Sequence, residues 1–174
     1  MITSEDIKLR AVEPTDIDLI FEWENDTTIW HLSNTLIPFS RFDLEQYVLN
    51  ASKDIFSAKQ VRLMIDLKES NETIGCIDLF DFEPLHRRAG IGILINNQER
   101  NKGYASKAID LILKHSFETL NLHQLYCNIE ENNKKSLDLF KKKQFKEIGI
   151  KKDWNLRNGD WVDEHILQYI FSKI

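Results

Sequence analysis

Residues 92–117 read GILINNQERNKGYASKAIDLILKHSF, and within them an alternating apolar pattern gives way to a helical one across a polar turn. The apolar side chains at positions 89, 91, 93 and 95 share one parity, which predicts a strand over Arg88–Ile95. From Ala105 onward the apolar residues recur at helical spacing, so a helix is expected to begin close to Gly103. The sequence therefore predicts strand, turn and helix in direct succession.

The turn of this unit is a candidate anion site. The first amide hydrogens of a helix have no intrahelical partner and carry the positive end of its dipole, so they bind phosphate well. Gly103 permits backbone angles, and a close approach of the ligand, that a side chain would obstruct. The alternative is an ordinary connection with basic residues on its surface, since neither the Walker loop nor the dinucleotide fingerprint is present. The turn consists of Arg100, Asn101, Lys102, Gly103, Tyr104 and Ala105.

The pattern Arg100-x-x-Gly103-x-Ala105 resembles Q/R-x-x-G-x-G/A, the acetyl-CoA signature of the GNAT N-acetyltransferases. Other segments agree with the ribosomal-protein-alanine and spermidine acetyltransferase branch of that superfamily, and the resemblance covers nearly the whole chain. It implies the GNAT acyl-CoA N-acyltransferase fold, an α/β fold with a mixed, splayed central sheet flanked by helices. The further matching segments are His86–Ala89, Leu120–His123, Asn133-x-x-Ser136 and Phe145–Glu147.

Length and composition fit this class. A chain of 174 residues with 42% hydrophobic content suits one domain over 1–174. No apolar run is long enough for a membrane span or a secretory signal, so no membrane contact and a cytoplasmic location are expected. The net charge of −5 argues against nucleic-acid binding and favours a cationic acceptor. Cys76 and Cys127 form no metal or redox spacing and are expected to be reduced core residues.

The remaining pattern gives a mixed succession of strands and helices. Thr15 is expected to cap the first helix, and Ser40 with Asp43 has the form of a capping box for the second. Residues 30–39 are aromatic and apolar without period, which suits either a flexible wall of a ligand site or a loop covering the core. The other expected elements are strands over Ile7–Val12, Val61–Leu67, Thr73–Phe82 and Gln124–Glu130, a helix capped by Asn132 or Asn133, and a final hairpin around Asn158-Gly159.

The resemblance implies acetyl-CoA as co-substrate and no metal. The pyrophosphate is expected on the amides from Arg100 to Ser106, and the pantetheine arm on the exposed backbone of Leu94 and Ile95. A strand amide near Leu94 is the expected oxyanion donor. The thioester would lie beside the strand that contains Asn128, and Asn133 would bind the pantetheine or the thiolate side.

The reaction requires an amine with a pKa of about 10 to lose a proton before it attacks. By the resemblance, Asp81 aligns with an acidic residue of the acceptor site and is the candidate base. Asp78 and Asp81 have opposite parity in their strand, so at most one should face a pocket unless a bulge intervenes. Phe140 stands where many members have a tyrosine that donates a proton to the sulfur. Ser136 or a water can replace it, although a helix serine commonly bonds its own backbone.

The expected acceptor is a primary amine: a small amine, a polyamine or a protein N-terminus. Gly90 and the segment 33–36 lack acidic residues that spermidine acetyltransferases carry, which weakens the case for a polycation. Trp154 and Trp161 either line the acceptor pocket or pack under the last hairpin. A CoA-binding or protein-interaction module without turnover is the alternative, and the acyl chain preferred is open. Exposed apolar residues over 36–42 suit a contact in a homodimer.

Overall fold

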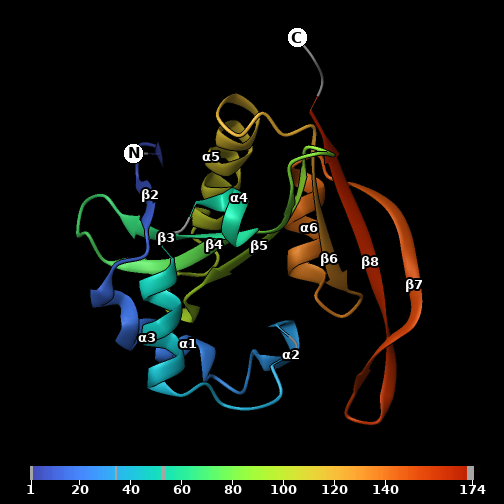
Figure 1. The fold of residues 1–174 in the computed structure, drawn as a ribbon. Coiled ribbons are helices and arrows are strands. Elements are labelled where there is room, and N and C mark those ends of the chain that lie inside the picture. Colours follow the sequence, from blue (N-terminus) through green and yellow to red (C-terminus); the bar gives the residue numbers. More distant parts are fainter. Residues whose placement is uncertain (1, 34, 52–53, 172–174) are drawn as a thin grey trace.

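The structure, a computed structural model, describes residues 2–33, 35–51 and 54–171. Its strands join one eight-stranded sheet in the order β1-β2-β3-β4-β5-β6-β8-β7 (Figure 1). Neighbouring strands are antiparallel except for β5 and β6, which run parallel. The strands are β1 (Ile2–Thr3), β2 (Ile7–Ala11), β3 (Val61–Leu67), β4 (Thr73–Glu83), β5 (Arg88–Ile95), β6 (Gln124–Glu130), β7 (Lys146–Arg157) and β8 (Asp160–Ile170).

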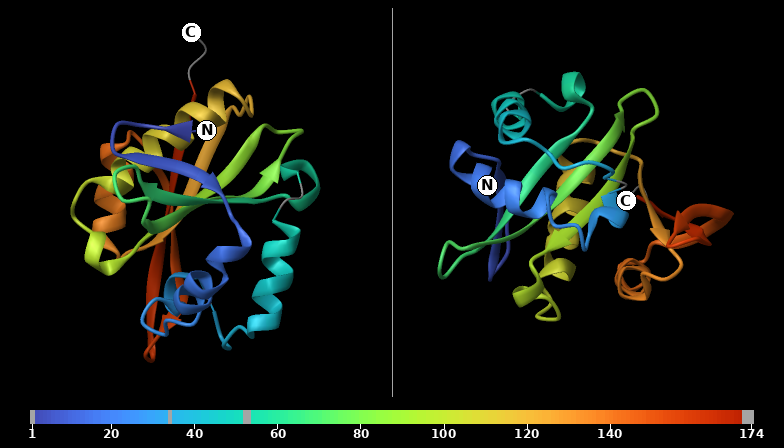
Figure 2. Two further views of the ribbon diagram at one scale, coloured as in Figure 1. Left: turned by 90° about the vertical axis from the view of Figure 1, so that its left-hand side faces the viewer. Right: turned by 90° about the horizontal axis from the view of Figure 1, so that it is seen from below.

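Helices cover both faces of the sheet, because successive strand residues point to opposite sides (Figure 2). In β3, Met64 packs with Ile20 and Val48 on one face. The next residue, Ile65, joins the larger cluster on the other face, which includes Ile109. No helix within the described residues has both the length and the apolar character that a bilayer crossing requires. The helices are α1 (Ile17–Glu24), α2 (Trp30–Ser33), α3 (Arg41–Asn50), α4 (Ile55–Ala58), α5 (Tyr104–Glu118) and α6 (Lys134–Lys142), with 3₁₀ turns η1 (Pro14–Asp16) and η2 (Asn97–Glu99).

The two central strands, β5 and β6, part along their length. They pair from Arg88 with Gln124 only as far as Gly90 with Tyr126. Beyond that point β5 stays paired with β4 as far as Ile95, while β6 stays paired with β8 as far as Glu130. Figure 1 shows the two strands diverging toward the side on which α2 lies. The expected splayed sheet is confirmed, and its opening faces the start of α6.

Most local predictions are confirmed. The strands over Arg88–Ile95, Val61–Leu67 and Gln124–Glu130 have the expected bounds. Ser40 caps α3, since its Oγ accepts the N–H of Asp43 at 3.0 Å.

The start of the first helix and the segment 30–39 differ in detail from the sequence predictions. Thr15 is not the cap of the first helix: it lies inside the turn η1, and Asp16 takes the N-cap position of α1 without a side-chain cap hydrogen bond. The Asp16 Oδ2 instead accepts the N–H of Glu13, at the start of η1, at 2.8 Å. Part of the segment over 30–39 forms the single-turn helix α2, and Leu36 beyond it is 88% exposed.

Asp16 also belongs to a buried ion cluster that ties β2 to β3. The Arg10 guanidinium donates to both oxygens of Asp16, at 2.7 and 2.8 Å, and to Asp66 at 2.7 Å. Both carboxylates are buried. Burial alone would raise the pKa of Asp16, but hydrogen bonds from Arg10 and Glu13 hold this pKa below its usual value. The stabilisation from Asp16 is therefore present at neutral pH and is lost as the pH falls through the lowered folded-state pKa.

We expect Arg10→Ala to lower the free energy of unfolding by about 3–5 kcal/mol at pH 7, because it leaves the buried Asp16 without a cation and the buried Asp66 with only the longer contact of 3.6 Å to Lys8. Urea denaturation measures the loss. The control is Arg41→Ala, which removes an arginine paired with Asp18 at the surface and should cost less than about 1 kcal/mol. Equal losses in the two variants would contradict the special weight given to the buried cluster.

Candidate active site

The turn before α5 has the backbone that an anion site needs. Gly103 is the N-cap of α5 and has φ of +87°, in the left-handed region. A Cβ built at this position would meet nothing within 4 Å in the chain. The space in front of the first amides of the helix is therefore open, and the backbone angle explains why a glycine stands there.

Side chains of the turn are held beside the strand rather than over the helix start. The Arg100 Nε donates to the carbonyl of Ile95 at 2.9 Å. Lys102 pairs with Glu99 at 2.8 Å. The two cations thus have partners within the chain, and the main-chain amides are the groups of this turn that are best placed for a phosphate.

The backbone direction of β5 corrects one expected contact. The Asn96 N–H donates to the carbonyl of Ile74 on β4 at 2.8 Å. Since backbone groups alternate along an antiparallel strand, those of Leu94 also point to β4, while those of Ile93 and Ile95 point to the open side. The main chain of Leu94 is therefore paired with β4 and is not open to the pantetheine arm, which corrects that expected contact, while Ile95 lies on the open side as expected.

A cavity of about 170 Å³ lies in the gap between β5 and β6. It brings together Asn128, Asn133, Ser136 and Phe140, four residues that the sequence analysis singled out. Asn133 caps α6, since its Oδ1 accepts the N–H of Ser136 at 3.3 Å. The buried ring of Phe140 packs edge to face on Phe145, with centroids 5.0 Å apart, so this position offers no hydroxyl. The same cavity is also lined by His31, Glu130, Asn155 and Glu164.

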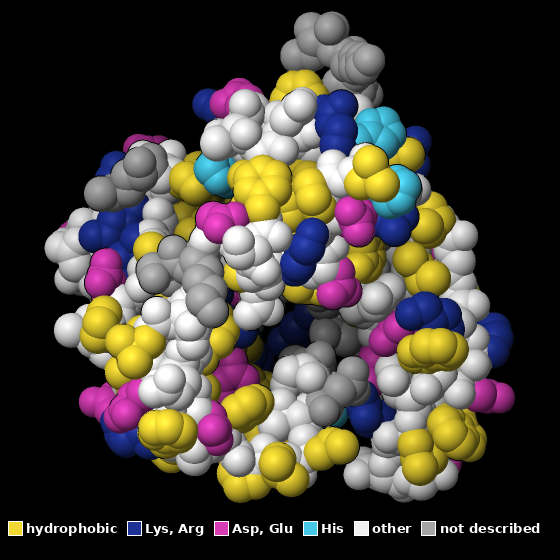
Figure 3. Space-filling view, in the orientation of Figure 1, with side chains coloured by type: hydrophobic (Ala, Val, Ile, Leu, Met, Phe, Trp, Pro, Cys, Tyr) yellow, Lys and Arg dark blue, Asp and Glu magenta, His cyan; other side chains and the backbone are white. Residues whose placement is uncertain are grey.

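A larger cavity of about 610 Å³ lies on the other side of the strand gap. Figure 3 shows a deep hollow, with charged side chains around it, on the face that carries the opening of the sheet. Its walls include Trp23, Phe80 and Trp154. Trp154 therefore lines this cavity, as one of the two interpretations of the sequence predicts, while Trp161 is absent from its lining. Both side chains are more than half exposed. The charged residues of its lining are Glu24, Arg62, Asp78, Lys151 and Glu164.

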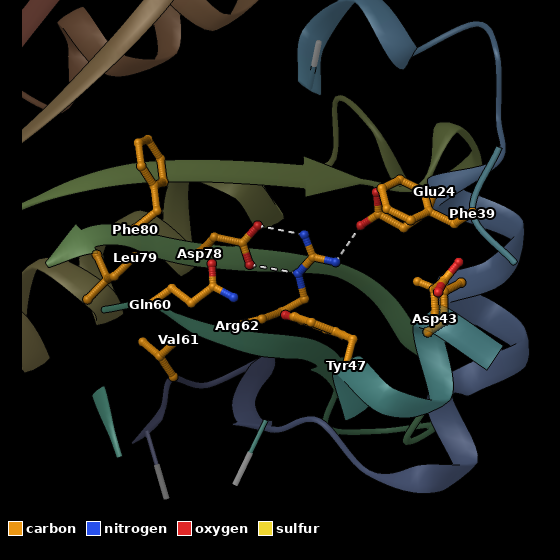
Figure 4. A pocket seen from close by; sticks show the side chains of 11 residues that line it. Glu24, Phe39, Asp43, Tyr47, Gln60, Val61, Arg62, Asp78, Leu79 and Phe80 are labelled. Carbon is orange, nitrogen blue, oxygen red and sulfur yellow. Dashed lines mark hydrogen bonds and ion pairs between the residues drawn. The ribbon is translucent and has the colours of Figure 1, made fainter. Parts of the chain in front are cut away.

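Arg62 is the centre of the charge on one wall (Figure 4). Its guanidinium binds both oxygens of Asp78, at 2.8 and 2.9 Å, and reaches Glu24 at 2.5 Å. Burial would lower the pKa of Arg62, but its anionic partners, Asp78 above all, keep this pKa well above the usual value. Arg62 stays charged, and it already neutralises much of the charge on the two acids. These three residues also line an adjoining cavity of about 410 Å³ with Tyr47 and Phe39.

Asp81, the predicted base, lies apart from this centre. A bulge with a positive φ of 48° at Asp81 shifts the register of β4 after Phe80. Its side chain is exposed and is absent from the lining of the three cavities described above. Its Oδ2 accepts the Tyr126 hydroxyl at 3.2 Å. Of the two strand carboxylates, Asp78 is the one that faces the cavity, as parity allows.

The sequence analysis missed three polar residues of the cleft. Glu130 and Glu164 lie opposite each other on β6 and β8, and Asn155 comes from β7. Both glutamates are buried, although they stand in strands whose other face carries the core. The available signal was the presence of Glu130 at the end of β6 and of Glu164 within the polar run Asp163–His165 of β8. It does not show which face of the strand is buried by a partner, so pattern alone could not find these residues.

Comparisons with known proteins agree with this geometry. A family model described as acetyltransferase (GNAT) domain matches residues 6–146. A spermidine N(1)-acetyltransferase of Vibrio cholerae is 28% identical over 170 residues, covering 96% of this chain and 94% of the relative. The uncharacterized N-acetyltransferase p20 of Bacillus licheniformis is 26% identical over 172 residues, covering 98% and 94%. The structure of spermidine N-acetyltransferase from Vibrio cholerae in complex with CoA and spermine aligns with a TM-score of 0.84 at 26% identity, covering 96% of each chain.

The sheet opens between β5 and β6, and helix α5 begins at Gly103 beside this opening. These two features are those of an acyltransferase with the GNAT fold. The chain belongs to the GNAT acetyltransferase family. It is an N-acetyltransferase, which moves an acetyl group to an amine.

The two cavity thiols should be inert. Burial raises the pKa of both Cys76 and Cys127 to about 12, with the Asp78 charge adding to the effect at Cys76. At pH 8 each should hold roughly a thousandfold less thiolate than an ordinary cysteine. We expect negligible alkylation by iodoacetamide in the native protein and complete alkylation in urea, followed by mass spectrometry. Rapid labelling of the native protein would contradict the burial.

Proposed function

We propose that the acetyl donor is acetyl-CoA and that it binds in the gap between β5 and β6. The parting of these strands beyond Gly90 is the observation that carries this proposal. The pyrophosphate would be held by the amides from Arg100 to Ser106, where Gly103 leaves room for it. The Vibrio cholerae enzyme with a similar fold was solved in complex with CoA, which supports the choice of coenzyme.

The pantetheine arm would complete the open edge of β5. Its amides can pair with the backbone of Ile93 and Ile95, in the manner of a peptide added to a sheet. The carbonyl of Ile95 already accepts from Arg100, so the N–H of Ile95 and both groups of Ile93 are the available partners. Either N–H can also serve as the oxyanion donor that the tetrahedral intermediate requires. Asn128 and Asn133 would lie along the other side of the arm.

The acceptor would enter through the larger cavity and meet the thioester carbonyl at the strand gap. Orientation of the two substrates can supply roughly 7–11 kcal/mol of the barrier reduction. The departing thiolate, with a pKa of about 8–9, leaves without obligatory protonation. Phe140 cannot give it a proton, and Ser136, which lines the same cavity, or a water would do so instead. Asp81 remains a candidate base only if it acts from outside this cavity.

We infer that the preferred acceptor is a primary amine with one positive charge and an apolar or aromatic body. Three carboxylates line the larger cavity, but Arg62 and Lys151 line it as well, which leaves a single net negative charge. The ring of Phe80 also lies 2.2 Å from the place of a Cβ at Gly90, so the acid expected there in polyamine enzymes has no room. The second candidate is a polyamine, which the spermidine acetyltransferases among the relatives favour.

The exposed apolar residues Leu36, Ile37 and Phe42 suit a contact between copies of this chain. Self-association through this segment stays a proposal, which sedimentation of a Leu36→Ser variant would test.

An amine panel tests the acceptor. With acetyl-CoA, we expect acceptor-dependent thiol release with arylalkylamines at a kcat/KM at least about tenfold above that for spermidine, a preference of roughly 1.4 kcal/mol. A preference for spermidine would select the polyamine candidate. CoA binding without thiol release for any amine would support the module that lacks turnover.

The phosphate loop is tested by a matched pair of glycine variants. Gly103 and Gly159 both have positive φ, of 87° and 93°, and both have open space at the Cβ position. Gly103→Val and Gly159→Val should therefore lose similar stability. CoA at a hundred times its dissociation constant should stabilise the wild type by about 2.7 kcal/mol. We expect thermal shifts to show this gain in Gly159→Val and not in Gly103→Val; an equal gain in both would remove the loop from the site.

A further inference from the structure

The two cavities of the strand gap meet along a short common border. The residues that line both are Ile91, Gly92, Ile93, Asn128 and Glu164. We call the cavity of about 170 Å³ the donor cavity and the cavity of about 610 Å³ the acceptor cavity. Among the described residues, Glu164 is the one titratable side chain that lines both. A group that takes a proton from the attacking amine must stand at this border, because the nitrogen has to reach the thioester carbonyl there.

We propose that Glu164 is the general base, a catalytic residue that removes a proton from the acceptor amine directly or through one water. This inference rests on the proposed function, because it concerns the same cleft. Glu164 comes from β8, in the last hairpin, and it lies beyond residues 6–146 that match the family model.

Its neighbours fix the carboxylate without using up its capacity. Lys151 donates to Oε1 at 2.8 Å and Asn155 donates to Oε2 at 3.2 Å. A carboxylate has about four acceptor positions, so each oxygen can accept one further hydrogen bond. Lys151 is itself held over the ring of Trp154, 4.6 Å from the centroid. Lys151 and Asn155 are therefore positioning residues, and they keep the carboxylate in one orientation.

The other acids of the cleft are less suited to the task. Arg62 donates to both oxygens of Asp78 and also to the carboxylate of Glu24. Glu130 lines the donor cavity but not the acceptor cavity, and Arg157 binds its Oε1 at 2.9 Å. The other charged and titratable groups that line the two cavities or bind those groups are Lys151, Glu130 with Arg157, His31 of α2, Arg62 with Glu24 and Asp78, and the two thiols Cys76 and Cys127.

The ammonium gives its first proton to the Glu164 carboxylate, and the neutral nitrogen then forms the C–N bond with the acetyl carbon. The C–S bond breaks, and the second nitrogen proton passes to the thiolate. Glu164 returns its proton to solvent, so each turnover yields one amide, one thiol and one released proton.

The test compares two nucleophiles in Glu164→Gln. For a primary alkylamine at pH 7, kcat should fall by at least about a hundredfold, as expected for loss of a general base, while the KM for acetyl-CoA stays unchanged. For an alkoxyamine of the same carbon skeleton, which is largely unprotonated at this pH, we expect less than about a fivefold loss. A loss of equal size for both nucleophiles, or none for the alkylamine, would overturn the proposal.

A binding measurement gives a readout apart from turnover. With CoA in place of acetyl-CoA, calorimetry should show weaker binding of the alkylammonium to Glu164→Gln by at least about fivefold, with CoA affinity retained as proof of an intact fold. Glu147→Gln is the control, since Glu147 is an exposed glutamate of β7 bonded by Lys141 and His165. Unchanged alkylammonium binding in Glu164→Gln would count against the proposal. If the wild type releases no thiol with any amine, the proposed function fails. If the wild type is active and Glu164→Gln is equally active with the alkylamine, this inference alone fails.

Discussion

The structure depends on a hydrogen-bond deficit at the centre of its sheet. Where β5 and β6 separate, each strand keeps one paired edge and leaves the other open. Unpaired backbone groups that are removed from water cost about 1–3 kcal/mol each, so the open edges call for a partner that carries amides. A thiol-bearing coenzyme with a peptide-like arm meets this requirement. The cleft is thus a consequence of strand pairing, and the proposed coenzyme would bind there through the same backbone hydrogen bonds that pair strands in a sheet.

Two devices keep the strands apart. On the β6 side, α6 begins at the opening, and its cap Asn133 and its residue Phe140 both line the gap. On the β5 side, the chain leaves the strand at Ile95, where Arg100 binds the last carbonyl, and turns into α5 through Gly103. The strand end and the helix start are therefore fixed to one another. This places the amides of the helix at one end of the open edge, as a ligand with phosphates at one end and a thioester at the other requires.

The sequence contained most of the fold. Period-two runs with clear turns on either side, such as Val61–Leu67 and Gln124–Glu130, gave strands with the right bounds, because their alternation matches a core on one face. The cap predicted at Thr15 was wrong because Thr15 lies inside the turn η1 and Asp16 takes the N-cap position of α1. The distant partner of Asp16, Arg10, is a contact that no local pattern shows. Asp81 lies outside the cavity that Asp78 lines, as the opposite parity of the two residues allows, and the bulge after Phe80 is a further feature that no local pattern shows. Nonlocal ion pairs and bulges are the features that short-range patterns cannot carry.

The same limit explains why sequence patterns did not reveal Glu164 as a residue of the site. Periodicity shows that Glu164 is on a strand, but the contacts that matter come from register: β8 pairs with β6 on one side and β7 on the other, which brings Lys151 and Asn155 to its carboxylate. A member of this family without a hydroxyl at Phe140 has lost a convenient acid for the sulfur. The thiolate can depart without one, since it is a far weaker base than the amine. The amine, in contrast, cannot attack until it has lost a proton. The reaction therefore needs a base for the amine more than an acid for the thiolate, and the proposed base is the carboxylate at the junction of the two cavities.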